Sequence, residues 1–294
     1  MPNRSQPQFF LSSLASLVSA KHPAYTLVIR LQVELTMATY LECAGRTLAA
    51  SRKIRSACFC IAVFSAVLLE AAQAVGASLA LVLAVDVSAS VTADSYVLQR
   101  DGIARAFENA RLIEAISTVA GGMDSLVLEW SDPDRVNVTV DWSRVHDPDS
   151  AAAFAAAVRS TKRTSNGLTA IGPALLTSAS EFDHLPEPAA RRVIDISGDG
   201  MANFGLSPTL ARDRIVAAGI SINGLAILTE EPWLAGYYDS NVIGGPGAFV
   251  VVARDFGSFA DAILRKLVRE VAGASLPNSR PPAGRERVGV AQMQ

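Results

Sequence analysis

The sequence predicts an α/β fold, with a doubly wound and mainly parallel sheet that has one antiparallel edge strand. Between residues 77 and 272, short apolar runs typical of strands alternate with longer stretches of helical periodicity. One pair of strand-like runs is separated only by the turn sequence SDPD, which predicts a single hairpin. Half of the 294 residues are hydrophobic and 18% are charged, so the chain can bury a sizeable core. Such a pattern is typical of a sheet packed between two layers of helices.

The first half of the pattern carries a strand, a long helix and the hairpin. Residues 78–85 (SLALVLAV) are uniformly apolar, as expected of a strand covered on both faces. Residues 95–120 have helical periodicity, and the hairpin strands are expected at 125–130 and 135–142. Two further helices are expected at residues 149–161 and 170–182, the second ended by the prolines that follow it.

The second half repeats the alternation of strand and helix. Residues 192–197 (RVIDIS) are expected to form a strand that ends in GDG. The helix at 208–218 has a proline in its first turn and Gly219 just past its end, the usual asymmetry. The last helix, 256–272, has an apolar stripe at helical spacing. Between them we expect a strand at 220–228, a short helix at 231–239 and a strand at 248–252.

Residues 52–74 have the three parts of an export signal. Basic residues at 52, 53 and 55 precede an uncharged run of 13 residues, 57–69, and the small-x-small sequence Ala-Gln-Ala follows at 72–74. As a helix this run spans about 20 Å, less than the roughly 30 Å of a bilayer core. We therefore expect a cleaved signal peptide and a periplasmic or secreted protein. An uncleaved anchor and a buried helix are the alternatives.

The ends of the chain have no clear fold signal. Residues 1–51 show no sustained periodicity, whereas a signal peptide normally starts close to the initiator. We expect translation to begin at Met37 or near residue 50, which makes 1–51 a non-structural extension; a genuine extension is the alternative. Residues 273–294 are polar and contain proline, and we expect a flexible tail. The folded domain is therefore expected at 77–272.

Charge and cysteine content exclude several functions. Residues 1–74 hold seven Lys/Arg against three Asp/Glu, and the rest holds 19 against 25, so an acidic main body is not expected to bind nucleic acid. All three cysteines precede residue 61 and only two histidines follow it, which excludes thiolate metal sites, cysteine nucleophiles and His-rich zinc sites from the main body. The P-loop and the G-x-S-x-G elbow are absent from the sequence.

Oxygen-bearing side chains stand where two strands end and one helix begins. Asp86, Ser88 and Ser90 follow the first strand directly. Asp199 follows the strand that ends in GDG, and Thr169 precedes the helix expected from 170. Ligands of doubly wound sheets bind at the carboxyl ends of the strands, so we expect these side chains to converge. Two carboxylates and three hydroxyls suit Mg²⁺, Ca²⁺ or Mn²⁺ rather than Zn²⁺.

Each of these side chains also has an ordinary structural interpretation. Ser90 or Thr92 could cap the following helix, Thr169 could cap the next one, and Asp199 could stabilise a turn. Asn203 either orients the loop after Asp199 or is itself a turn residue. The three tryptophans are expected in the core or packed on the hairpin: Trp130, Trp142 and Trp233.

Three sequence segments together resemble a known metal site. DVSAS (86–90), GLTAIGPAL (167–175) and SGDG (197–200) are similar to the D-x-S-x-S…T…D metal-ion-dependent adhesion site of von Willebrand factor type A domains. The hairpin with Trp130 at its strand end matches as well. The chain most resembles a bacterial exported subfamily, the domain of unknown function 1194 family, in which the third element reads SGDG rather than TDG. The resemblance covers roughly residues 78–272.

This resemblance implies a von Willebrand factor A-like, Rossmann-type three-layer sandwich and a role for each site residue. Ser88, Ser90 and Thr169 would coordinate a divalent cation, above all Mg²⁺, directly or nearly so. Asp86 and Asp199 would act through bound water and orient the hydroxyls. One coordination position would stay open for an Asp or Glu carboxylate of a partner protein. Gly198 stands where many relatives have Thr, which puts a further hydroxyl contact there in doubt.

The function that follows is an exported, metal-dependent protein-binding module and not an enzyme. The alternatives are a metal-dependent hydrolase that uses the same acidic strand ends, with Lys162 nearby, and a structural domain that has lost metal binding. No membrane contact of the mature form is expected unless the signal is an uncleaved anchor. Because ionised carboxylates hold the cation, affinity should fall as the pH drops toward the ordinary carboxylate range near 4.

Overall fold

The computed structural model describes residues 77–229 and 231–274. The expected N-terminal extension (1–51), the expected signal peptide (52–74) and the expected tail beyond residue 274 lie outside these described residues. Within them, no helix has both the length and the apolar character needed to cross a membrane.

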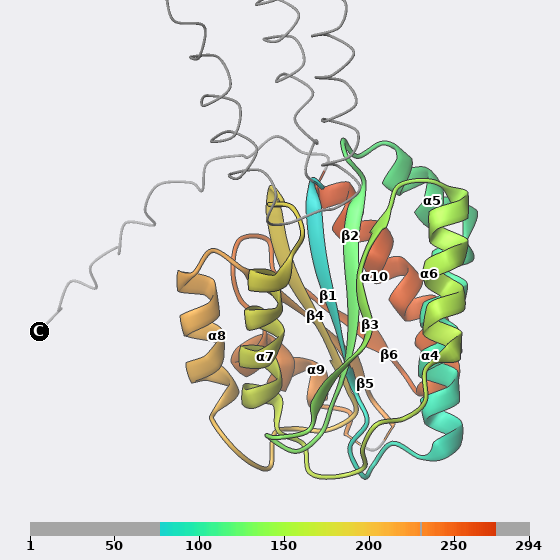
Figure 1. Cartoon of the computed structure of the whole chain (residues 1–294). Helices are drawn as coiled ribbons and strands as arrows, with labels where there is room; N and C mark the ends of the chain where they lie inside the picture. The colour runs from blue at the N-terminus through green and yellow to red at the C-terminus, as the bar shows by residue number, and fades with distance from the viewer. Residues whose placement is uncertain (1–76, 230, 275–294) are drawn as a thin grey trace, which may run out of the picture. The chain divides into compact units, whose positions relative to one another are not determined.

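Six strands form one sheet in the order β3-β2-β1-β4-β5-β6 (Figure 1). Only β3 runs antiparallel, against β2, and the other neighbours pair in parallel. The chain builds outward from β1 through β2 to β3, then returns to β4 on the other side of β1. The predicted doubly wound, mainly parallel sheet with one antiparallel edge strand is therefore confirmed. The strands are β1 Leu79–Asp86, β2 Met123–Trp130, β3 Val136–Val145, β4 Arg191–Gly198, β5 Ser221–Ile227 and β6 Val250–Ala253.

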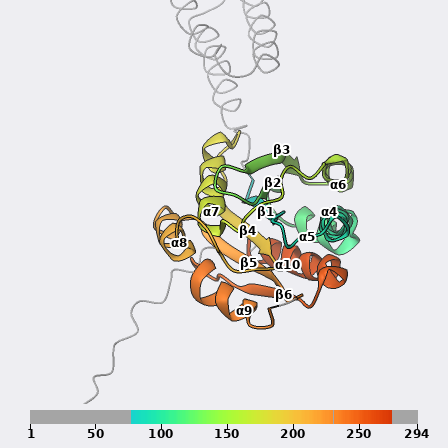
Figure 2. The same ribbon diagram turned by 90° about the horizontal axis from the view of Figure 1, so that it is seen from below.

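Helices cover both faces of the sheet, which makes three layers (Figures 1 and 2). On one face lie α4 Ala93–Glu108, α5 Ala110–Ser117, α6 Pro148–Ser160 and α10 Phe259–Ala274. On the other lie α7 Ile171–Ser180, α8 Pro208–Ala217 and α9 Leu234–Tyr237. Short turns complete the set: η1 Glu181–His184, the π-helical η2 Tyr238–Val242 and η3 Phe256–Ser258.

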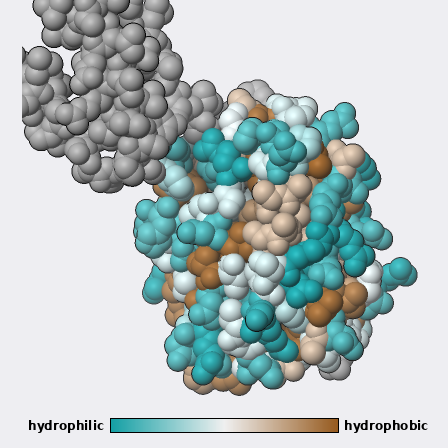
Figure 3. Space-filling view, turned by 45° about the vertical axis from the view of Figure 1, so that its right-hand side comes forward, coloured by the Kyte–Doolittle hydropathy of each residue, from teal (hydrophilic) through white to brown (hydrophobic). Residues whose placement is uncertain are grey.

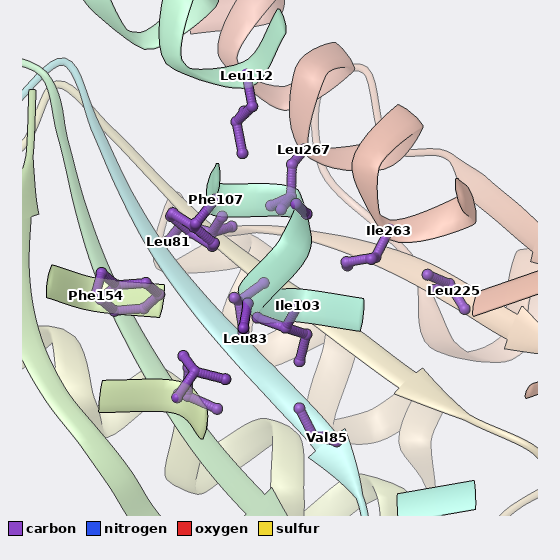
Figure 4. Packing of buried hydrophobic residues seen from close by; sticks show 14 of the residues in the cluster. Leu81, Leu83, Val85, Ile103, Phe107, Leu112, Phe154, Leu225, Ile263 and Leu267 are labelled. Atoms are coloured by element: carbon purple, nitrogen blue, oxygen red, sulfur yellow. The ribbon is translucent and has the colours of Figure 1, made fainter. Parts of the chain in front are cut away.

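Side chains of the central strand β1 alternate between the two layers. Leu81, Leu83 and Val85 pack into the cluster under α4, α6 and α10, where Phe107 and Ile263 join them (Figure 4). The residues between them belong to the second cluster, under α7 and α8: Ala80, Val82 and Ala84. Burial on both faces explains why the run is uniformly apolar, because full burial of each such side chain contributes about 1.5–3 kcal/mol.

The prediction of one long helix at 95–120 is wrong, because the structure has two helices there. Asn109, between α4 and α5, has extended backbone angles (φ −77°, ψ 127°). Its side-chain oxygen accepts a hydrogen bond from the N–H of Arg111 at 3.0 Å and so caps α5. Asparagine is a strong N-cap residue, and this local bond competes with continuation of the helix.

Candidate metal centre

The loop after β1 is folded into a tight turn around Asp86. The N–H of Ser88 donates to Oδ1 of Asp86 at 2.7 Å, and the N–H of Val91 donates to the carbonyl of Ser88 at 3.0 Å. From α4, the Gln99 amide donates to the carbonyl of Asp86 at 3.1 Å. The turn therefore places the side chains of Ser88 and Ser90 next to the end of the strand.

Asp199 meets this turn because β4 is the parallel neighbour of β1. The register pairs Val85 with Ser197, so the two strands end side by side. The Ser90 hydroxyl donates to Oδ1 of Asp199 at 2.7 Å, and the hydroxyls of Ser88 and Ser90 lie 3.2 Å apart. Residues 109 positions apart in sequence thus form one cluster of oxygen atoms.

Thr169 is held against the same two segments through its backbone. The N–H of Asn203 donates to the carbonyl of Thr169 at 3.0 Å, and the N–H of Thr169 donates to Oδ1 of Asn203 at 2.9 Å. The N–H of Ala89 donates to the carbonyl of Gly167 at 2.8 Å. The structure therefore brings all three predicted segments together, and Asn203 has the loop-orienting role considered for it.

The capping interpretations do not account for these residues. Thr92, rather than Ser90, caps α4, since its hydroxyl accepts from the N–H of Ser95 at 3.1 Å. The N-cap of α7 is Ala170, and no side chain caps that helix. Thr169 is therefore no side-chain cap, and Asp199 does more than stabilise a turn.

Asp86 is buried and carries an oxygen that lacks a partner. Among the described residues, neither its Oδ2 nor the hydroxyl of Tyr238 has a hydrogen-bond partner. Burial, together with the smaller effect of the nearby charge of Asp199, raises the pKa of Asp86 to about 7. Burial also raises the pKa of Tyr238 well above its ordinary value.

Gly198 allows this close arrangement. A Cβ atom at position 198 would lie 2.6 Å from the Tyr238 hydroxyl and 2.8 Å from Oδ2 of Asp86, closer than such atoms approach. A threonine therefore does not fit here without shifts of both Tyr238 and Asp86. This contact explains why the chain departs from the threonine that the resemblance would place at this position.

The donor atoms fit a hard divalent cation. Every side-chain donor is an oxygen, from two carboxylates and from hydroxyls, which suits Mg²⁺, Ca²⁺ and Mn²⁺. A cation would also offset the cost of the buried, unpartnered carboxylate oxygen of Asp86. In residues 77–229 and 231–274, no group of three or more His, Cys, Asp or Glu side chains could hold a metal, so serine and threonine hydroxyls would have to contribute.

Sequence reasoning missed two residues that fix the loop before Thr169. Arg163 donates to the carbonyls of Val87 and Ser88, both at 2.9 Å. Oε2 of the buried Glu129 accepts from the N–H and the hydroxyl of Thr164, at 2.7 and 2.8 Å. The sequence contains a signal for Glu129, because this residue is a carboxylate within the apolar run 125–130. It contains no comparable signal for Arg163.

The tryptophans follow the prediction in two cases out of three. Trp130 is fully buried in the core. Trp142 packs on Phe182 and its ring N–H donates to the carbonyl of Glu181 at 3.0 Å. For Trp233 the prediction is wrong, because this side chain lies in the short turn before α9 and is 51% exposed.

One family matches most of this domain. Residues 76–275 match the sequence model of a family described as "Protein of unknown function (DUF1194)". The match confirms the family resemblance drawn from the three motif segments. No curated protein matches the chain.

Solved structures of three proteins are similar to part of the chain. Proximal thread matrix protein 1 from the mussel byssus, with zinc in its metal-ion-dependent adhesion site, is 17% identical with a TM-score of 0.47, covering 69% of this chain and 47% of that one. The pilus adhesin SpaC of Lactobacillus rhamnosus GG is 13% identical with a TM-score of 0.49, covering 69% and 30%. A von Willebrand factor type A protein of Catenulispora acidiphila is 20% identical with a TM-score of 0.44, covering 67% and 42%. The chain thus spans less than half the length of each.

Proposed function

The chain belongs to the family described as "Protein of unknown function (DUF1194)", and from its site we propose that it is a divalent-metal-dependent protein-binding module. In this proposal the ion bridges the site to an Asp or Glu carboxylate of a partner protein. The module is exported, periplasmic or secreted, as residues 52–74 indicate.

One observation carries the proposal, namely the oxygen cluster at the ends of β1 and β4. Ser90 binds Asp199 across the two strands, Ser88 lies beside Ser90, and the buried Asp86 has an oxygen without a partner among the described residues. This cluster lies at the switch point of a doubly wound sheet, where such folds bind ligands.

The residues divide into two roles. Ser88, Ser90 and Thr169 would hold the cation, while Asp86 and Asp199 orient the hydroxyls and supply the compensating charge. A bound divalent cation supplies attraction for a carboxylate that the two aspartates alone would repel. The proposal is a binding role without catalysis, consistent with the lack of a P-loop and a nucleophile elbow in the sequence.

Thermal unfolding of the purified full chain tests the metal centre. We expect Mg²⁺, Mn²⁺ or Ca²⁺ to raise the Tm relative to EDTA. At 100 times the Kd the gain is about 2.7 kcal/mol, or roughly 5–10 °C for a domain of this size. Asp86→Ala should lose this rise, while Asp134→Ala, an exposed residue of the hairpin turn, should keep it. A wild-type Tm that no divalent cation raises, or an Asp86→Ala protein that responds like wild type, contradicts the proposal.

A further inference from the structure

The surface around the oxygen cluster is formed by segments without charge. Residues 87–93, 164–176 and 200–210 contain no Asp, Glu, Lys or Arg. The Ala89–Gly167 and Asn203–Thr169 backbone hydrogen bonds hold these segments together. Asp86 and Asp199 adjoin these segments as ligand residues. Two further charged side chains contact the segments: Asp132 accepts from the N–H of Leu168 at 2.9 Å, and Arg163 donates to the carbonyls of Val87, Ser88 and Ser165, each at 2.9 Å.

Four large apolar side chains stand exposed on these neutral segments; Leu210, 53% exposed, lies on α8, and the other three lie in the loops beside the oxygen cluster. Phe204 is 54% exposed, and Leu168 and Met201 are each 43% exposed. Phe204 and Leu168 flank the Asn203–Thr169 pair, and Met201 follows Asp199 by two positions. We name these three residues the apolar rim. They belong to the loop before α7 and the loop after β4.

Exposed large apolar side chains also occur elsewhere, as at Val97, Leu98 and Trp233. On the face that Figure 3 shows, hydrophobic residues lie among many hydrophilic ones. At the apolar rim, by contrast, exposed apolar groups adjoin buried carboxylates without charged neighbours in the same segments. Exposed apolar groups that adjoin a polar site mark interaction surfaces.

We propose that the partner presents a single Asp or Glu flanked by apolar side chains, rather than a run of acidic groups. This inference rests on the proposed metal-dependent binding. Charge complementarity carries it: the cation would have one open coordination position for one carboxylate, and the neutral segments contain no cationic side chain for further negative groups. The guanidinium of Arg163 is engaged by three backbone carbonyls of these segments, and Asp132 adds a negative charge beside Leu168, so these contacts give further carboxylates of a polyanion no compensating charge. Apolar neighbours of the carboxylate would instead pack on the apolar rim.

Binding of synthetic peptides to the full chain tests this proposal. Four fluorescent probes of equal length are compared in Mn²⁺ and in EDTA: Glu between Leu and Phe, Glu between serines, Gln between Leu and Phe, and oligoglutamate. The variants are Phe204→Ser and a control of similar exposure, Val138→Ser, on the edge strand β3. The metal-induced rise in Tm is measured for each protein alongside.

The proposal predicts a specific pattern. In Mn²⁺, wild type and Val138→Ser bind the apolar Glu peptide at least tenfold more tightly than the serine, Gln and oligoglutamate probes. Phe204→Ser prefers the apolar Glu peptide over the serine-flanked Glu peptide by less than threefold. It keeps its metal-induced rise in Tm. If wild type shows the metal-induced rise in Tm but binds no peptide or prefers none, the role of the apolar rim is overturned and the metal centre is not. The same holds if Phe204→Ser binds the peptides as wild type does. Absence of the rise in wild type overturns the metal centre and this inference together.

Discussion

Asp86 is the residue whose surroundings say most about the site. It is a buried carboxyl whose Oδ2 has no partner among the residues that the structure describes, and Asp199 adds a second negative charge nearby. A group of this kind is costly to ionise in a protein interior. Its retention at a strand end is explained if a cation compensates the charge.

The pH dependence of stability follows from the raised pKa of Asp86. In the metal-free protein, burial raises this pKa from 3.8 to about 7. Between these values the folded state holds a proton that the unfolded state has lost, so the free energy of unfolding falls as the pH rises through this window. At about 1.4 kcal/mol per pH unit, the whole effect amounts to about 4 kcal/mol. We expect Asp86→Asn to lose this fall, so that it is the more stable protein at pH 8 in EDTA.

Denaturant unfolding of both proteins in EDTA from pH 5 to pH 8 measures this difference. Other titrating groups, including Asp195, are common to the two proteins and cancel. With Mn²⁺ present, wild-type affinity should decline about tenfold per pH unit below 7, because the ion competes with the proton. The decline in affinity is thus expected near neutral pH. The sequence alone predicts a decline near pH 4, because it does not show that Asp86 is buried. If the free energy of unfolding changes with pH in the same way for wild type and Asp86→Asn, the raised pKa of Asp86 is refuted.

At the scale of elements, the loop between α6 and α7 is held from two sides. Glu129, on β2, accepts two hydrogen bonds from Thr164, and its Oε1 accepts from the hydroxyl of Tyr96 at 2.9 Å. Arg163 reaches the opposite way, to the carbonyls of Val87 and Ser88. The position of Thr169 relative to Ser88 therefore depends on these two side chains.

Arg163→Lys should weaken metal binding more than it weakens the fold. Arginine donates from Nη2 to the carbonyls of Val87 and Ser88 and from Nε to the carbonyl of Ser165, whereas lysine keeps the charge but has only one nitrogen for the three carbonyls. We expect affinity for Mn²⁺ to fall about tenfold, as for other residues that orient metal ligands, and the metal-free protein to lose about 1–3 kcal/mol. Isothermal titration measures the first and denaturant unfolding the second. Arg135→Lys, an exposed arginine of the hairpin turn, is the control. Unchanged Mn²⁺ affinity in Arg163→Lys would show that the contact serves the fold only.

The sequence predicted the elements better than their ends, and the site better than its supports. Apolar β1 and the stripe of α10 were visible because burial on known faces imposes a period. The break at Asn109 was not, because one side-chain hydrogen bond decides it. Asp86, Ser88, Ser90, Thr169 and Asp199 follow from strand ends and motif order. Arg163 could not be inferred, since its bonds to carbonyls of the loop after β1 depend on the tertiary structure alone.

At the scale of the whole molecule, buried charges join one helical layer to the sheet. Lys266, on α10, forms ion pairs with Asp195 of β4 and with Glu270, the latter at 3.5 Å. Asn223 of β5 donates to Glu270, and Arg191 lies 3.8 Å from that carboxylate. Lys266, Asp195 and Glu270 are almost completely buried, so the cluster crosses the interface between α10 and two strands inside the core.

Removal of one member of this cluster should cost more than removal of a pair. Burial raises the pKa of Asp195 although the charge of Lys266 acts in the opposite direction, so Asp195 depends on that lysine to ionise. Lys266→Met leaves uncompensated buried carboxyls, and we expect a loss of about 3–5 kcal/mol, or roughly 6–20 °C in Tm. In the double variant Lys266→Met, Asp195→Leu the carboxyl of Asp195 is gone, and Glu270 keeps its hydrogen bond from Asn223 and its ion pair with Arg191, so at least half of the lost stability should return. A double variant no more stable than Lys266→Met would show that the lysine stabilises α10 through packing of its stem rather than through its charge.

Because the oxygen cluster lies at the ends of β1 and β4, the metal-induced rise in Tm should persist in both variants.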